Sequence, residues 1–206
     1  MSTAAATILA PVSNDAGRII QIEHPYRALV EFTGACPFLF HRWSIEGVEA
    51  KGKAAKGSKA KKTDDLESYV YRNEEGLLSI PSEYFRQSAI GASKFKQDPR
   101  SPRKSAMDLF KAGVICLTEY CSLGVKDWEF VDRRRVQVQR NAITRSRPAM
   151  TAGWKATAEF QVLLPEYIGP DLLNETLNFG GRLIGVGDNR PSYGRFQLTR
   201  FEVLDD

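Results

Sequence analysis

The stretch GGRLIGVGDNRPSYGRFQL, residues 180–198, places five glycines between a predicted helix and a predicted last strand. Glycine adopts positive φ angles readily and lets another backbone approach closely. A glycine-rich turn with exposed amides and adjacent cations is a typical phosphate-binding arrangement. The stretch therefore predicts a phosphate-binding loop. Its expected members are Gly180, Gly181, Gly185, Gly187 and Gly194, with Arg190 and Arg195 as the adjoining cations.

The rest of the chain has the pattern of a small α+β domain. Residues 154–164 place Ala156 and Phe160 on one apolar side, which predicts a strand. Pro170, with Asp171 after it, predicts a helix start. The predicted strands are 26–34, 114–117, 154–164 and 195–203, and the predicted helices are 83–94, capped by Ser82, and one that begins at Pro170. This order of strand, helix, strand, strand, helix, strand is the split βαβ pattern of a ferredoxin-like fold.

Two insertions are expected to interrupt this core. Residues 47–65 consist mostly of lysine, glycine and alanine and have little to bury, so they predict a mobile basic loop. Residues 128–150 alternate in character and predict a β-hairpin. The expected organisation is a disordered tail over 1–17 and a single domain over 18–206, with insertions at about 44–66 and 126–150.

Two shorter segments connect these elements. Residues 69–71 and 77–80 flank Gly76 and predict a small hairpin. Residues 97–104, QDPRSPRK, predict a basic loop because two prolines interrupt them. A short helix is expected over 105–111.

The charges are sorted along the chain. Residues 51–62, 86–111 and 126–147 contain 20 of the 29 lysines and arginines but only 5 of the 25 acids. These segments therefore carry a net charge of +15, and the remainder carries −11. Such sorting is typical of a protein that binds a polyanion. Clustering of charge in flexible loops is the alternative interpretation.

Metal and cofactor chemistry is not expected. The three cysteines form no CxxC pair, and there are only two histidines. No Walker or HExxH motif is present. No apolar run approaches the roughly 18 residues of a membrane helix, and the expected location is the cytoplasm.

At this point the chain resembles the RAMP superfamily, in particular the crRNA-binding backbone subunits of CRISPR effector complexes. The glycine-rich stretch resembles that family's glycine-rich loop, and residues 78–87, LSIPSEYFRQ, resemble the start of its first core helix. Residues 37–41, PFLFH, resemble the segment that follows its first strand. The sequence departs from the family pattern at Ser82, where a glycine is usual, and at Pro191.

The resemblance implies a ferredoxin-like core with a β-hairpin thumb over 128–150 and a finger-like insertion over 44–66. It also implies that backbone subunits stack along a bound strand, so a homo-oligomer or filament is expected in which the thumb reaches the neighbouring protomer. Other effector-complex subunits are expected partners, and a phage-encoded relative has the same general pattern.

The candidate binding residues are cations that can hold phosphates and rings that can stack on bases. The phosphate candidates are Arg133, Arg134, Arg135, Arg140, Arg145, Arg147, Arg190, Arg195, Arg86 and His41, with Lys51, Lys53, Lys56, Lys59, Lys61 and Lys62 in the basic loop. The stacking candidates are Trp43, Tyr71, Trp128 and Tyr193. Asp188 is expected to have a structural role in its turn.

These features predict a protein that binds single-stranded nucleic acid with little dependence on sequence. The cations lie far apart in the sequence and are expected to converge on one continuous trough beside the terminal glycines. RNA is favoured over single-stranded DNA by the resemblance alone. The alternatives are a metal-independent endoribonuclease that uses His41 as general acid or base, and a protein that mimics or inhibits a CRISPR complex. Enzymatic activity is not expected in the favoured interpretation.

Overall fold

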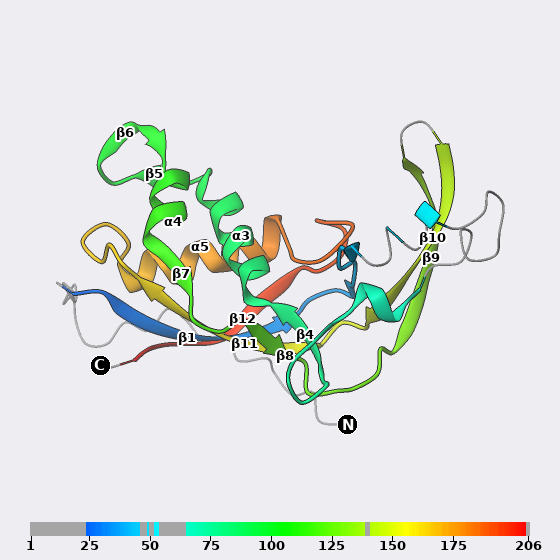
Figure 1. The fold of residues 1–206 in the computed structure, drawn as a ribbon. Helices are drawn as coiled ribbons and strands as arrows, with labels where there is room; N and C mark the ends of the chain where they lie inside the picture. Colours follow the sequence, from blue (N-terminus) through cyan, green and yellow to red (C-terminus); the bar gives the residue numbers. More distant parts are fainter. Residues whose placement is uncertain (1–23, 46–48, 50–51, 54–64, 139–140, 205–206) are drawn as a thin grey trace, which may run out of the picture.

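The centre of the fold is an antiparallel sheet of four strands (Figure 1). The computed structural model describes residues 24–45, 49, 52–53, 65–138 and 141–204. Side by side, the strands are β12 (Phe196–Leu204), β1 (Tyr26–Gly34), β11 (Lys155–Val162) and β7 (Val114–Cys116). Every second residue of β1 is buried, as expected for a strand with one covered face.

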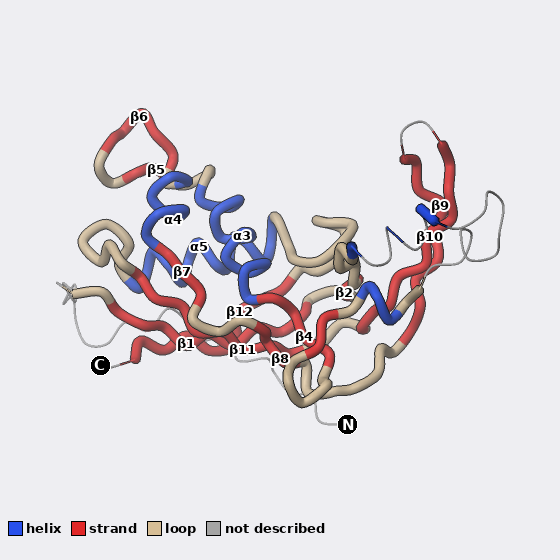
Figure 2. Tube along the Cα trace, viewed as in Figure 1, coloured by secondary structure: helices blue, strands red, loops and turns tan. Residues whose placement is uncertain are grey.

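Two helices cover one face of this sheet (Figure 2). They are α3 (Ser82–Ser93) and α5 (Pro170–Leu183), and they also pack on each other. The ring of Phe32, from β1, stacks on that of Phe85, from α3, with centroids 4.0 Å apart. Both side chains are fully buried, so the aromatic core lies between the sheet and the helices.

The opposite face of the sheet carries paired charges. Arg27 lies 3.1 Å from Glu159, and Arg200 lies 3.2 Å from Glu31. Strand alternation places no aromatic side chain of β1, β11 or β12 on this face. The face therefore offers neither surplus cations nor stacking platforms.

A long hairpin projects from one end of the sheet, on the side that the helices cover (Figure 1). It consists of β9 (Phe130–Val138) and β10 (Asn141–Met150), and β10 also pairs with β2 (Phe38–Leu39). Because β2 follows β1 directly, the base of the hairpin is attached next to the end of β1. The predicted hairpin over 128–150 is confirmed.

Smaller elements complete the fold. A second sheet joins β3 (Tyr71–Arg72), β4 (Leu78–Pro81) and β8 (Tyr120–Ser122), and the 3-10 helix η1 (Glu67–Tyr69) precedes it. Helix α4 (Met107–Gly113) leads into β7. A two-stranded ribbon, β5 (Gln97–Asp98) and β6 (Ser101–Ser105), follows α3. Within the described residues, no helix is both long and apolar enough to traverse a bilayer.

Several local predictions are confirmed and others are wrong. The strands and long helices occur within a few residues of their predicted positions. Residues 97–104 lie in the β5–β6 ribbon rather than in a loop. Ser82 does not cap α3, because its hydroxyl donates to the Thr118 carbonyl and the helix has no side-chain cap. The predicted tail over 1–17 and most of the 44–66 insertion lie outside the described residues.

Gly180 and Gly181 belong to α5 and not to the loop predicted to contain them. A Cβ on Gly180 would lie 2.9 Å from the Ser88 hydroxyl of α3, and one on Gly181 would lie 2.2 Å from the Phe196 carbonyl of β12. These glycines allow α5 to approach its neighbours closely. Their role is in packing, and the phosphate-binding prediction is wrong for both.

Gly181→Ala should therefore destabilise the fold, because the new methyl group meets a backbone carbonyl that cannot move aside independently. We expect a loss of about 1–3 kcal/mol in the free energy of unfolding, measured in urea. Gly169→Ala is the matched control, because Gly169 has a φ of −69° and no atom within 4 Å of an added Cβ. Equal stability of the two variants would contradict this account.

Candidate nucleic-acid interface

The hairpin and the loop after α5 are joined by a buried ion pair. Arg147 of β10 is 5% exposed, and its Nε lies 2.5 Å from Oδ2 of Asp188. The Asp188 amide donates to the Leu39 carbonyl of β2. Burial acts to raise the pKa of Asp188, but hydrogen bonds from Arg147 and from the Asn189 amide outweigh it, so that the pKa lies below its ordinary value. The structural role predicted for Asp188 is confirmed, and Arg147 is held inside the protein.

The loop from Ile184 to Arg195 uses its glycines for backbone shape. Gly185, Gly187 and Gly194 have φ angles of 76°, 78° and 70°. A Cβ on Gly194 would lie 1.7 Å from the Val186 carbonyl. Eight loop amides already donate to acceptors within the protein. The prediction that this loop opens its amides as a phosphate cradle is therefore wrong for most of them.

His41 lies between Arg145 and Asp188. Nη1 of Arg145 is 2.8 Å from Nε2 of His41, and Nδ1 of His41 is 3.5 Å from Oδ2 of Asp188. Arginine only donates, so Nε2 accepts and the ring proton resides on Nδ1, facing the carboxylate. The lone pair of Nε2 is therefore occupied by the guanidinium. This arrangement does not favour His41 as a general base.

Arg134 contacts the glycine-loop residue Tyr193. Its guanidinium carbon lies 4.6 Å from the ring centroid, and its Nη2 donates to the phenol oxygen at 2.6 Å. Asp132 accepts from the same guanidinium, with Nε and Oδ2 2.7 Å apart. The hydrogen bonds to Asp132 and Tyr193 together raise the pKa of Arg134. Tyr193 therefore connects the loop to the hairpin.

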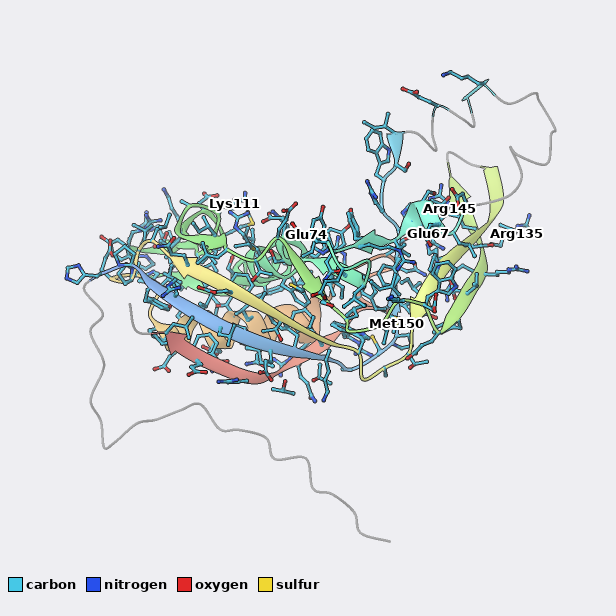
Figure 3. All side chains as sticks on the ribbon, turned by 60° about the horizontal axis from the view of Figure 1, so that its bottom comes forward. Glu67, Glu74, Lys111, Arg135, Arg145 and Met150 are labelled. Carbon is cyan, nitrogen blue, oxygen red and sulfur yellow. The ribbon has the colours of Figure 1, made fainter. Side chains whose placement is uncertain are left out.

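The hairpin arginines do not share one face. The strand register sets Arg134 opposite Arg145, so these two point to the same side of the hairpin. Arg133 and Arg135 alternate with Arg134 and point to the other side, where both are exposed. Figure 3 shows Arg135 on the outer edge of the hairpin. The expectation that these cations converge on one trough is wrong for Arg133 and Arg135.

Aromatic rings extend this surface toward α3. The guanidinium of Arg42 lies 5.6 Å from the Tyr71 ring centroid, and the Tyr71 and Tyr84 hydroxyls are 3.1 Å apart. Burial, followed by the Tyr71 hydrogen bond, raises the pKa of Tyr84, and the nearby charge of Arg190 opposes that rise. Tyr71 and Tyr120 line a hollow of about 420 Å³ beside them. The sequence analysis missed Arg42, Tyr84 and Tyr120.

We call the surface that these two groups of residues form the hairpin-base face. It consists of Arg42, Tyr71, Tyr84, Arg134, Arg145, Arg190 and Tyr193. Cations and rings are interspersed on it, and Arg190 is exposed. Trp43 lies near it in the chain and is 71% exposed.

Other predicted residues lie elsewhere. Arg86 donates to the Val114 and Lys111 carbonyls and to Glu83, so its guanidinium serves the fold and does not line a ligand groove. Arg195 lines a separate hollow between α5 and β12. Trp128 is half-buried and packs against the core, so it is no stacking platform. The predictions for Arg86 and Trp128 are wrong, whereas that for Arg195, whose side chain is exposed, stays a prediction.

Most of the predicted basic loop lies outside the residues that the structure describes. Lys53 is exposed and lies 4.0 Å from Glu49. Lys51, Lys56, Lys59, Lys61 and Lys62, together with Arg140 of the hairpin, lie outside the described residues. Among the residues that the structure does describe, no three or more His, Cys, Asp or Glu side chains form a group that could hold a metal ion.

Comparison with known proteins finds a likeness in fold alone. No family model matches the chain, and a search of curated proteins finds no relative. Among solved structures, the chain is similar to one from the cryo-EM structure of the Type III-B Cmr-beta bound to cognate target RNA. The TM-score is 0.52 and the identity 11%, over 88% of this chain and 61% of that one. The present chain thus spans about three fifths of the length of its structural neighbour.

The ion pair predicts the behaviour of Asp188→Asn. This change keeps the side-chain shape and leaves the buried Arg147 charge without its partner, which typically costs about 3–5 kcal/mol. Because Asp188 is 27% exposed, we expect a loss near the lower end of that range, measured by urea unfolding at neutral pH. Asp108→Asn is the control, since that side chain is 87% exposed.

The same variant has a defined pH dependence. A depressed carboxyl pKa stabilises the folded state above the ordinary pKa of 3.8, and this stabilisation is lost as the pH falls through the folded-state value. The difference in stability between the natural protein and Asp188→Asn should therefore shrink in acid. A difference that is constant with pH, or absent at neutral pH, would contradict the ion pair.

Proposed function

We propose that this protein binds single-stranded nucleic acid, RNA in the first instance, across the hairpin-base face. The observation that carries the proposal is the contact of guanidinium groups with tyrosine rings, Arg134 with Tyr193 and Arg42 with Tyr71, together with the Tyr71–Tyr84 pair at the start of α3. Proteins that hold single strands combine cations for the phosphates with rings for the bases.

The fold supports a place in the RAMP superfamily. The strand order β12-β1-β11-β7, with α3 and α5 on one face, supports a ferredoxin-like core. The β9–β10 hairpin corresponds to the thumb, within a single domain over 18–206. The structural neighbour is described as bound to target RNA, which favours RNA over DNA as the first ligand to test.

The chemistry of the face favours binding without sequence readout. Arginine matches the phosphate oxygens that every nucleotide carries. Tyrosine stacks on any base, because each base has a π-face. Among the described residues at this face, the acids Asp188 and Asp132 are already paired, with Arg147 and Arg134 respectively.

The exposed side of the hairpin supports assembly along the ligand. Arg133 and Arg135 point away from the hairpin-base face and are exposed. In our proposal they contact the neighbouring protomer, or the strand that it holds. Such a head-to-tail arrangement produces a filament when its rotation does not close. Other subunits of an effector complex are further candidate partners.

The binding proposal predicts a specific salt dependence. For single strands, the logarithm of the binding constant falls with the logarithm of salt concentration by about 0.7 for each phosphate neutralised. The double variant R145Q/R190Q should bind a fluorescent RNA more weakly and reduce this slope by about 1.4. The measurement is anisotropy at several salt concentrations, with R200Q, on the opposite sheet face, as control.

Three results would overturn this proposal. The first is that R145Q/R190Q and R200Q both keep the RNA affinity and salt slope of the natural protein. The second is cleavage of RNA without divalent metal that disappears in His41→Ala, which would establish the endoribonuclease alternative. The third is failure to bind any oligonucleotide, which would leave the protein-binding alternative.

The assembly proposal predicts a change in size on long ligands. With an RNA of about 40 nucleotides, several times the usual span of one binding fold, native mass spectrometry should show several protomers on one strand. R133E/R135E should reduce that number while leaving the affinity for a short RNA unchanged. One protomer per long strand would contradict assembly without touching the binding proposal.

A further inference from the structure

The β5–β6 ribbon forms a second basic surface, remote from the hairpin. Figure 1 shows the ribbon and the β9–β10 hairpin rising at opposite ends of the molecule, both on the side of the sheet that the helices cover. Residues 94–111 contain six basic and two acidic side chains, a surplus of four positive charges. This segment was expected to share one trough with the hairpin, and that expectation is wrong.

Some of these cations are neutralised locally. Lys96 forms an ion pair with Glu175, Arg100 with Asp98, and Lys111 with Asp108 at 3.7 Å. The charges of Arg103 and Lys104 remain. Both side chains are exposed, and no ion pair joins either of them to an acid in the described part of the chain.

An exposed ring lies at the base of the ribbon. Phe95 is 60% exposed, and the ammonium of Lys94 lies 4.8 Å from its centroid. Lys94 also follows the end of α3, where a cation is favourable for the helix dipole. The helix dipole explains why a cation is favourable at position 94, but it does not explain why the Phe95 ring is exposed.

The ribbon is held in a defined shape although it buries little. Asp98 is 3% exposed and accepts from the Arg100 amide at 2.9 Å and from its guanidinium. Those hydrogen bonds lower the pKa of Asp98 to about 2. The Ala106 amide donates to the Lys96 carbonyl and closes the base. Arg103, Lys104 and Phe95 are thereby presented to solvent from an ordered backbone.

We propose that the ribbon is a second contact for single-stranded nucleic acid. Arg103 and Lys104 hold phosphates, and Phe95 stacks on a base. A short ribbon that carries exposed cations, with an exposed ring at its base, offers the two kinds of group that such ligands require. This inference rests on the proposed function and extends it, because it adds a contact at the opposite end of the molecule. A long strand therefore engages both ends of one protomer, and a short strand engages the hairpin-base face alone.

The experiment compares R103Q/K104Q and F95A in the full chain with the natural protein. For an RNA of about 40 nucleotides, R103Q/K104Q should reduce the salt slope by about 1.4. F95A should weaken binding about tenfold at constant slope, since it removes stacking and no charge. For an RNA of about 8 nucleotides, within the span of one binding fold, both variants should match the natural protein.

The control is K155Q/R200Q, which removes the same charge from the opposite face of the sheet. Ultraviolet crosslinking supplies an independent readout, and it should attach RNA to the peptide that contains Phe95 in the natural protein. Equal thermal unfolding of all variants shows that they are folded. The substituted side chains are exposed, so we expect no change there.

The outcomes separate this inference from the proposed function. If R145Q/R190Q weakens binding and the ribbon variants equal K155Q/R200Q, the ribbon contact is wrong and the hairpin-base face stands. If R145Q/R190Q has no effect, the proposed function fails whatever the ribbon does. The ribbon inference is also overturned if R103Q/K104Q leaves RNA binding intact but abolishes binding to an acidic peptide or to anionic vesicles.

Discussion

The ion pair between Arg147 and Asp188 is the constraint on which the arrangement of the candidate site depends. It joins the hairpin to the loop after α5, and through the Asp188 amide it also holds β2. Nη1 of Arg147 is buried without a hydrogen-bond partner among the described residues. A buried charge of this kind is tolerated only beside its counter-charge. The hairpin base therefore has one position relative to the loop, and Arg134, Arg145 and Tyr193 are placed by it.

The framework was predictable because its signals are local. Alternation along β11 and the proline at the start of α5 predict those elements from a few residues each. The glycine-rich composition of residues 180–194 led to the wrong prediction that Gly180 and Gly181 lie in a loop. In sequence, a glycine in a closely packed helix cannot be distinguished from a glycine in a loop. Only the contacts of Gly180 with Ser88 and of Gly181 with Phe196 distinguish the two.

The site was predictable in kind and not in detail. The triplet Arg133–Arg135 lies on a strand, so its middle member must point away from the other two. The opposite orientations of Arg134 and of its two neighbours could have been predicted from the strand pattern alone. The partners of Arg86 and Trp128, by contrast, come from distant parts of the chain, and no sequence pattern reports them. The same holds for the separation of the ribbon from the hairpin.

The pairing of the arginines within the protein has a consequence for ligand choice. Arg134 is bonded to Asp132, and Arg145 to His41, before any ligand arrives. An incoming anion must exchange with these internal partners, so a lone small anion gains little from each site. In a polymer with many anionic groups, once one group has replaced an internal partner of an arginine, the next groups are held nearby at high effective concentration. Under the proposed function, these internal pairs favour long polyanions over free nucleotides and inorganic ions.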